Sequence, residues 1–207
     1  MRKLALWALA AFLLLPFSSQ ASFVSSATGG TTTTFSGGSG CFFGPSIGSS
    51  AGFGITASSD ACYNFSQSFG LDSNGAWNWE LVGDNTSSTM ITIDLGGLYS
   101  SVGGFMNYAP GYGTPVISAL AGDGVTVLES YDLSSVAPIF TPAAVNGGAF
   151  RGISRSSADI AYFQFGGSFS AMHDITLDDA SAVPEPSTLL LSVFALAGLG
   201  LLRRARC

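Results

Sequence analysis

The chain has 207 residues, with 13 acidic and 7 basic residues and a formal net charge of −6. Five of the basic residues stand in the two end segments, so residues 22–182 hold 12 acids and only 2 bases. A surface of that sign repels phosphate, so it excludes nucleic acid as a partner and adhesion to anionic lipid by charge alone. About 160 residues suit one domain with its own core.

The chain begins with the layout of a secretory signal. Arg2 and Lys3 precede an uninterrupted apolar run, residues 4–15, and small residues follow up to Ala21. A retained membrane anchor is the alternative, but the run is short for a bilayer span of about 20 residues. We therefore expect a signal peptide over residues 1–21, which signal peptidase removes after Ala21.

The next segment, residues 22–40, is rich in serine, threonine and glycine. Such a composition is typical of linkers, because it offers few side chains that can be buried. We expect this segment to be flexible and to lead into a folded domain over residues 41–182.

Cys41 and Cys62 are the only cysteines of the exported region. An even pair in an exported chain indicates a disulfide, which here would close a loop of about 20 residues. Two free buried thiols are the alternative. Cys207 follows the C-terminal arginines, which are expected to stay in the cytoplasm, so a membrane would separate it from Cys41 and Cys62.

Apolar and polar residues alternate with a period of two through much of residues 41–182, and glycine, asparagine or aspartate ends most of these runs. Short alternating runs with such boundaries predict an all-β fold, an antiparallel β-sandwich or jelly roll. No segment of this region keeps a helical period. The alternating apolar positions are Ile91, Ile93, Leu95, Val125, Val127, Ala161, Phe163, Phe165, Ile175 and Leu177.

Aromatic residues in turn-like surroundings are the candidates for sugar contact. Tyr108 and Tyr112 stand in "NYAPGYG", and exposed tyrosines in such a loop would stack on the apolar face of a sugar ring. Trp77 is a third candidate. The alternative is that the tyrosines pack under their own loop and that Trp77 anchors the core.

Acidic side chains could hold a structural calcium ion, since calcium prefers oxygen ligands. The candidate ligands are Asp72 in "DSNG" and Asp174 and Asp178 in "HDITLDD". The plain alternative for Asp72 is an Asx-type turn that leads into a strand. No other cofactor is expected, because a single histidine, His173, rules out sites built on several imidazoles.

"GPSIG", residues 44–48, matches the nucleophile-elbow pattern, with His173 far downstream. An elbow requires a strand before the serine and a helix after it, and no helical pattern follows Ser46. A Ser46–His173 hydrolase is thus the least favoured reading, and we expect no enzyme. Arg151 and Arg155, the two bases of this region, are expected to pair with aspartates in two-bond contacts, and binding of an acidic sugar is the alternative.

The C-terminal segment has three parts. Val183, Pro184, Glu185 and Pro186 form a stiff lead-in, an apolar run follows, and Arg203, Arg204 and Arg206 close the chain. A helix over residues 187–202 would be about 24 Å long, which spans a bilayer if the lipid thins and the arginines extend to the interface. The arginines would hold this end in the cytoplasm.

The segment 183–207 resembles the PEP-CTERM sorting signal. That resemblance implies recognition and processing near the Pro-Glu-Pro stretch by an integral-membrane exosortase, in Gram-negative bacteria that make extracellular polysaccharide. The stretches "NFSQSFGLDSNGAWNW" and "IDLGGLYSSVGGFMNYAPG" resemble galactose-binding-like jelly rolls, which implies a fold but no sugar specificity.

Taken together, the sequence predicts an exported, non-catalytic protein that is anchored transiently in the inner membrane and then sorted to the cell envelope, surface or extracellular matrix. Its partners would be signal peptidase, the exosortase and exopolysaccharide. A carbohydrate-binding module that recognises this polysaccharide is the alternative function.

Overall fold

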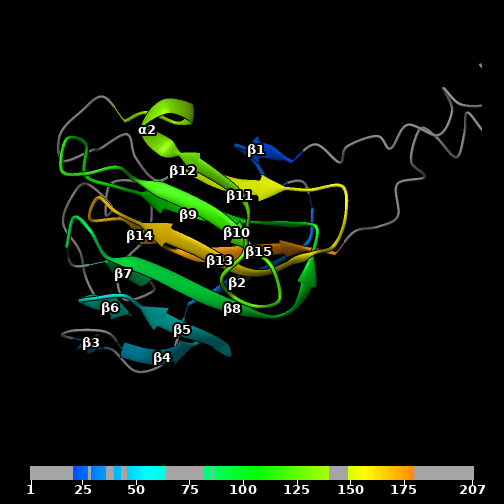
Figure 1. Ribbon diagram of the computed structural model, residues 1–207, viewed down its shortest axis with the longest axis horizontal. Coiled ribbons are helices and arrows are strands. Elements are labelled where there is room, and N and C mark those ends of the chain that lie inside the picture. Colours follow the sequence, from blue (N-terminus) through cyan, green and yellow to red (C-terminus); the bar gives the residue numbers. More distant parts are fainter. Residues whose placement is uncertain are drawn as a thin grey trace, which may run out of the picture.

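The computed structural model describes residues 21–27, 29–35, 40–42, 46–63, 82–84, 86–139 and 149–179. Two sheets, in which all paired strands run antiparallel, pack against each other (Figure 1). The predicted all-β class is thereby confirmed. Among these residues no helix has the length and apolarity to cross a membrane, and the expected span over residues 187–202 lies outside them, as do residues 1–20 of the signal peptide.

The larger sheet has nine strands, and β9 lies at its centre. Its main order is β1-β12-β9-β14-β7-β6-β3, while β15 pairs with both β9 and β2. The strands are β1 (Ser22–Val24), β2 (Thr31–Thr34), β3 (Gly40–Phe42), β6 (Ala61–Tyr63), β7 (Val82–Asp84), β9 (Ser101–Asn107), β12 (Ala149–Ser154), β14 (Ala171–Met172) and β15 (Asp174–Asp178).

The smaller sheet has six strands in the order β11-β10-β13-β8-β5-β4. They are β4 (Ser46–Ser50), β5 (Phe53–Ala57), β8 (Met90–Tyr99), β10 (Val116–Leu120), β11 (Val127–Asp132) and β13 (Ile160–Gly166). A single helical turn, α2 (Leu133–Val136), follows β11, and the Asp132 side chain caps it by accepting a hydrogen bond from Ser134 N–H.

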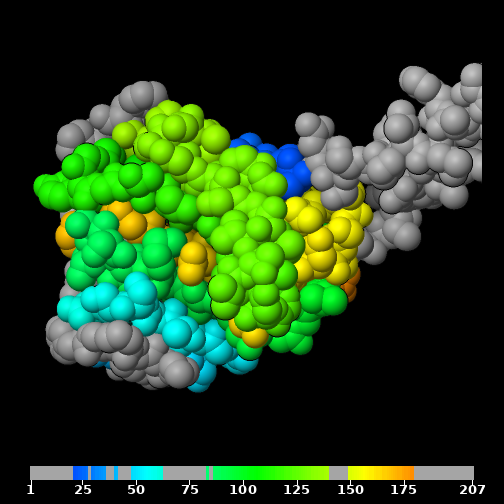
Figure 2. Space-filling view, viewed as in Figure 1, coloured from blue at the N-terminus to red at the C-terminus, as the bar shows by residue number. Residues whose placement is uncertain are grey.

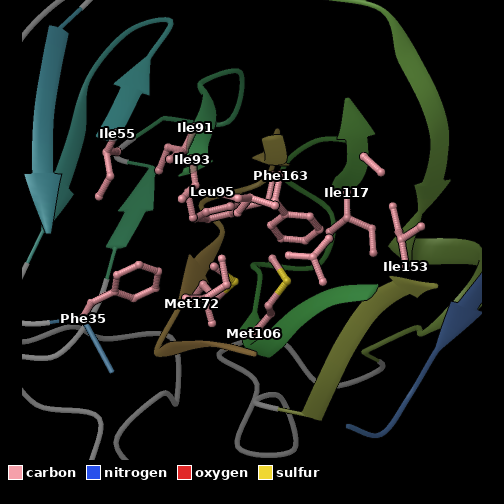
Figure 3. Close-up of a cluster of buried hydrophobic side chains, with 14 of the residues drawn as sticks. Phe35, Ile55, Ile91, Ile93, Leu95, Met106, Ile117, Ile153, Phe163 and Met172 are labelled. Atoms are coloured by element: carbon pink, nitrogen blue, oxygen red, sulfur yellow. The ribbon is translucent and has the colours of Figure 1, made fainter. Parts of the chain in front are cut away.

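The core lies between the sheets, and the alternating residues supply it. Ile91, Ile93 and Phe163 of the smaller sheet are fully buried, and they meet Met106 and Met172 of the larger sheet (Figure 3). Alternate residues of a strand share one face, so the apolar members of these strands point into the core. The predicted inward positions Leu95, Phe165, Ile175 and Leu177 are also buried.

The alternation predicts that Val125 and Val127 are buried, but both are exposed. Val125 stands in the turn before β11, and Val127 begins that strand at the edge of the six-stranded sheet. An edge strand offers one of its sides to solvent, so alternation alone did not decide whether these valines are buried.

Part of the segment that composition predicts to be flexible forms strands instead. Within residues 22–40, β1 pairs with β12, and β2 pairs with β15 along four residues, Thr31 to Thr34. Threonine suits a strand because its branched side chain fits a pleated surface. Thr32 and Thr176 hydroxyls also bond across these strands at 2.9 Å. Residues 31–34 therefore form a strand and not a flexible linker, because β15 pairs with them.

The disulfide between Cys41 and Cys62 is confirmed. The two cysteines face each other in register on β3 and β6, with a sequence separation of 21. The bond thus closes the loop that contains β4 and β5.

We expect the double variant Cys41→Ser, Cys62→Ser to lose about 3 kcal/mol of unfolding free energy, because the unfolded chain regains the entropy of a loop of this length. Urea unfolding of the oxidised parent and of the variant measures the loss. A reductant should lower the midpoint of the parent and leave that of the variant unchanged; equal midpoints before reduction would contradict the prediction.

The strand registers define two ends of the sandwich. At one end Gly166 pairs with Met90 and Val116, and the backbone N–H of Ala109 donates to Ser168 O. At the other end Ser101 pairs with Asp178, where β15 finishes. The residue that follows β15 therefore leaves from the end opposite the loops around Ala109.

Candidate functional site

Three loops meet at the end of the sandwich where β9 and β13 finish; we call residues 86–89, 108–115 and 166–170 the loop platform. Hydrogen bonds join them: Ala109 N–H donates to Ser168 O at 2.8 Å, the Ser168 hydroxyl donates to Ala109 O at 2.5 Å, and Gly167 N–H donates to Thr89 O at 2.9 Å. In Figure 2 the orange surface near residue 170 lies between the two green surfaces of the other loops.

Glycine permits the close approach of these loops. A Cβ atom on Gly113 would lie 2.1 Å from Gly167 O, and one on Gly167 would lie 2.3 Å from Thr114 O. Gly167 also has a φ of 88°. No other residue type fits both positions without moving the backbone, so glycine is required for the loops to approach this closely.

Tyr112 is the most exposed aromatic side chain of the platform. It keeps 61 % of its surface in solvent, and its ring meets the Phe169 ring edge to face with 5.7 Å between centroids. Phe169 stands between Ser168 and Ser170, both of which are buried, and has a φ of 50°. The backbone thus directs the Phe169 ring towards Tyr112 while its neighbours face inward.

The platform offers hydroxyl groups and no charge. Its sequences, "TSST", "YAPGYGTP" and "GGSFS", contain no acidic or basic residue. Thr86 organises the first loop, because its Oγ1 accepts from Thr89 N–H at 3.0 Å and lies 2.7 Å from the Thr89 hydroxyl. An exposed aromatic ring beside neutral hydroxyl groups is suited to contact an uncharged, partly apolar ligand.

Tyr108 does not face solvent, which corrects its assignment as a sugar contact. Only 2 % of its surface is exposed. Its hydroxyl donates to Ala137 O at 3.1 Å and accepts from Ile139 N–H at 2.9 Å. Burial raises the pKa of Tyr108 above its ordinary value of 10.0. Tyr108 follows β9 directly, and its position places the ring under the segment after α2 rather than in the loop.

Arg151 also differs from its expected role. It is 3 % exposed, and among the described residues no carboxylate lies within ion-pair distance. Instead its Nη1 donates to Met106 O at 2.5 Å and to Ala149 O at 3.1 Å, and its guanidinium stands 5.6 Å from the centre of the Tyr108 ring. Burial lowers the pKa of Arg151 below its ordinary value. It points inward from β12, where backbone carbonyls are the available acceptors.

Arg155 pairs with an aspartate as expected. Its Nε and Nη2 donate to the two carboxylate oxygens of Asp159 at 2.6 and 2.8 Å. The hydrogen bonds from Arg155 hold the pKa of the Asp159 carboxyl below its ordinary value. The pair also approaches β11, because Arg155 Nη1 donates to Leu128 O at 3.3 Å.

The calcium candidates do not converge on one another. Asp174 is buried beside β9 and accepts a hydrogen bond from Phe105 N–H at 3.1 Å, whereas Asp178 stands at the other end of β15, opposite Ser101. Asp72 lies outside the described residues. Within the ranges that the structure describes, no three acidic, histidine or cysteine residues gather as a metal site would require.

The Ser46 and His173 of the elbow hypothesis stand in different sheets. Ser46 opens β4 of the six-stranded sheet, and His173 lies between β14 and β15 of the nine-stranded one. Ser46 therefore begins a strand, whereas an elbow serine stands between a strand and a helix. Trp77, the third aromatic candidate, lies outside the described residues.

A comparison with known protein families finds a match in the C-terminal segment. Residues 182–205 match the PEP-CTERM protein-sorting motif. The chain carries an exosortase sorting signal. The motif indicates an exported protein that is processed by an exosortase, a membrane enzyme. No curated protein and no solved structure matches the chain, so the resemblance of its body to galactose-binding-like domains stays a prediction, with which the β-sandwich is compatible.

Sequence reasoning did not find Phe169. The only local signal is a single aromatic residue between two serines after Gly166 and Gly167. Its pairing with Tyr112, which is 57 positions away, depends on loops that only the tertiary structure brings together.

Proposed function

We propose that this PEP-CTERM protein is a non-catalytic protein of the cell surface or extracellular matrix that associates with exopolysaccharide. The sorting motif carries the proposal: it begins at residue 182, directly after a β-sandwich whose last strand ends at Asp178. The resemblance of this signal to those of polysaccharide-producing Gram-negative bacteria supports the matrix as a destination. The tail would anchor the chain transiently in the inner membrane before release or attachment.

The absence of catalysis is part of the proposal and rests on the residues. The chain has one histidine, and Ser46 stands on the other sheet. Ser46 would therefore lack the imidazole that usually activates a serine nucleophile.

A carbohydrate-binding module is the second candidate, and one observation favours it. Tyr112 exposes 61 % of its surface on a hydrogen-bonded, uncharged loop platform. Aromatic rings offer sugars a flat apolar contact with little loss of side-chain entropy.

The association is tested by fractionation of a host that makes exopolysaccharide and of a mutant host that does not. The full-length gene is expressed in both hosts. We expect its processed product to sediment with the matrix in the first host and to remain in the medium or envelope in the second. Washing with 0.5 M NaCl should not release it, since salt screens charges but hardly affects apolar contacts. The same distribution in both hosts would contradict the association with polysaccharide.

A further inference from the structure

We propose that Tyr112 and Phe169 form a stacking site for neutral hexopyranose units of a polysaccharide. Tyr112 would stack on the sugar, and Phe169 would hold the tyrosine ring in position. The inference rests on the proposed association with exopolysaccharide and goes further by naming the surface and the chemical class of sugar.

The backbone of Phe169 is the first argument. Its φ of 50° lies in the left-handed region, which a bulky side chain rarely adopts. Glycine would adopt this conformation without strain, and two glycines precede it in the same loop. The phenyl ring is thus kept at an energetic cost, and it packs edge to face against the exposed Tyr112. Strain of this kind clusters at binding sites, where it fixes geometry before the ligand arrives.

The rigidity of the platform is the second argument. A ring that stands on a mobile loop loses entropy when a ligand orders it, whereas a ring on a locked loop does not. Gly113 and Gly167 interlock through carbonyl contacts, and the Ser168 hydroxyl and backbone both bond to Ala109. Tyr112 is therefore exposed but held on a fixed backbone.

The distribution of charge on the protein favours a neutral ligand. Residues 22–182 carry 12 acids and 2 bases, while the three loops of the platform carry none of either. An anionic polymer would approach a repelling surface and find no basic side chain on the platform to bind it. A neutral sugar meets no such barrier, and the hydroxyls of Thr86, Ser87 and Ser88 lie in the loop that contacts Gly113 through Ser87 O.

The position of the site fits a membrane-tethered protein. β9 runs from Ser101, which is opposite Asp178, to Asn107 at the platform end. The chain leaves β15 at Asp178, so the platform is at the end of the sandwich opposite the point where the chain continues towards the sorting motif. A seven-residue strand separates the two ends by roughly 20 Å. A polymer outside the membrane can therefore reach Tyr112.

Affinity electrophoresis of the full-length protein in detergent micelles tests the site. Native gels contain hydroxyethyl cellulose, galactomannan or dextran as neutral probes and alginate as the anionic probe. We expect at least one neutral polymer to retard the protein and alginate not to. Tyr112→Ala and Phe169→Gly should each raise the dissociation constant about tenfold, the loss expected for one buried ring contact.

Phe169→Gly separates binding from folding. Glycine accepts the positive φ, so the urea midpoint of this variant should equal or exceed that of the parent while its dissociation constant rises about tenfold. Val125→Ala is the matched control, because Val125 is 78 % exposed and stands in the turn after β10, at the opposite end of the sandwich. Its retardation should be unchanged.

Three results would contradict the proposed stacking site, and each has a different meaning for the wider function. Unchanged retardation in both aromatic variants would overturn the site, although the association with polysaccharide would stand. Absence of retardation by all three neutral polymers would also overturn it, and the fractionation of the two hosts would then decide the wider function. Retardation by alginate alone, abolished by a chelator, would replace the stacking site with a calcium bridge.

Discussion

Replacing Arg151 with alanine is expected to lower the free energy of unfolding by about 2–5 kcal/mol, the range for truncating a large buried side chain to alanine. The Arg151 side chain is almost fully buried, and Nη1 and Nη2 donate to the carbonyls of Met106, Ala149 and Ala137. Removal leaves these acceptors with fewer donors and opens a cavity between β12 and Tyr108.

The Arg151 contacts join the paired strands β12 and β9 to the segment after α2. Ala137 O accepts from Arg151 Nη2 at 3.4 Å and from the Tyr108 hydroxyl at 3.1 Å. β12, the end of β9 and the segment after α2 are therefore connected through one guanidinium and one phenol. Such a network is worth more than its separate bonds when all its members are present.

Two further substitutions separate charge from geometry. Arg151→Lys keeps the charge but cannot reach several carbonyls with a planar fork, so we expect it to recover little stability. Arg151→Met fills the volume and removes the cost of a buried cation whose Nε has no hydrogen-bond acceptor among the described residues. We expect Met to lose less stability than Ala.

Urea unfolding measures these differences, and Arg155→Ala is the control. Arg155 forms its ion pair with a partly exposed Asp159, for which a loss of about 1 kcal/mol or less is expected. An Arg151→Ala variant as stable as Arg155→Ala would show that the buried guanidinium is not required for the fold.

Substitution in the sorting segment should have the largest effect on the fate of the protein. We expect the triple variant Pro184→Ala, Glu185→Ala, Pro186→Ala to lose processing almost completely, with a fall in the mature fraction of about tenfold or more. Prolines favour an extended backbone beside Glu185, and alanines would allow a helix over the expected span, residues 187–202, to continue into the segment. A processing enzyme that reads an extended peptide would then lose its substrate.

Intact mass of the protein from the membrane, envelope and medium measures the processing. The parent should appear without its apolar ends, and the triple variant should accumulate in the membrane with residues 187–207 attached. Glu129→Ala, which removes an acid from β11, is the control and should be processed like the parent. Recovery of parent and variant in the same mature form would contradict a role for the Pro-Glu-Pro stretch.

The sequence by itself determined the fold class and the presence of the sorting signal. In residues 90–95 apolar and polar residues alternate, a local pattern that arises whenever one face of a strand is buried. Ile91, Ile93 and Leu95 could therefore be assigned to the core without knowledge of the strands beside them. The sorting motif is contiguous within residues 182–205 and is therefore recognisable without a structure. The disulfide followed from the count of cysteines and the exported context.

The candidate site required the tertiary structure, because exposure and pairing depend on residues that are distant in the chain. Tyr108 and Tyr112 stand in one loop and look alike in sequence, yet the first is buried under the segment after α2 and the second is exposed. Phe169 joins Tyr112 only because β9 and β13 finish at the same end of the sandwich. Likewise, the threonines of β2 form a strand because they pair with β15. These residues bury few apolar side chains, so the hydrogen bonds to the neighbouring strand are what order their backbone.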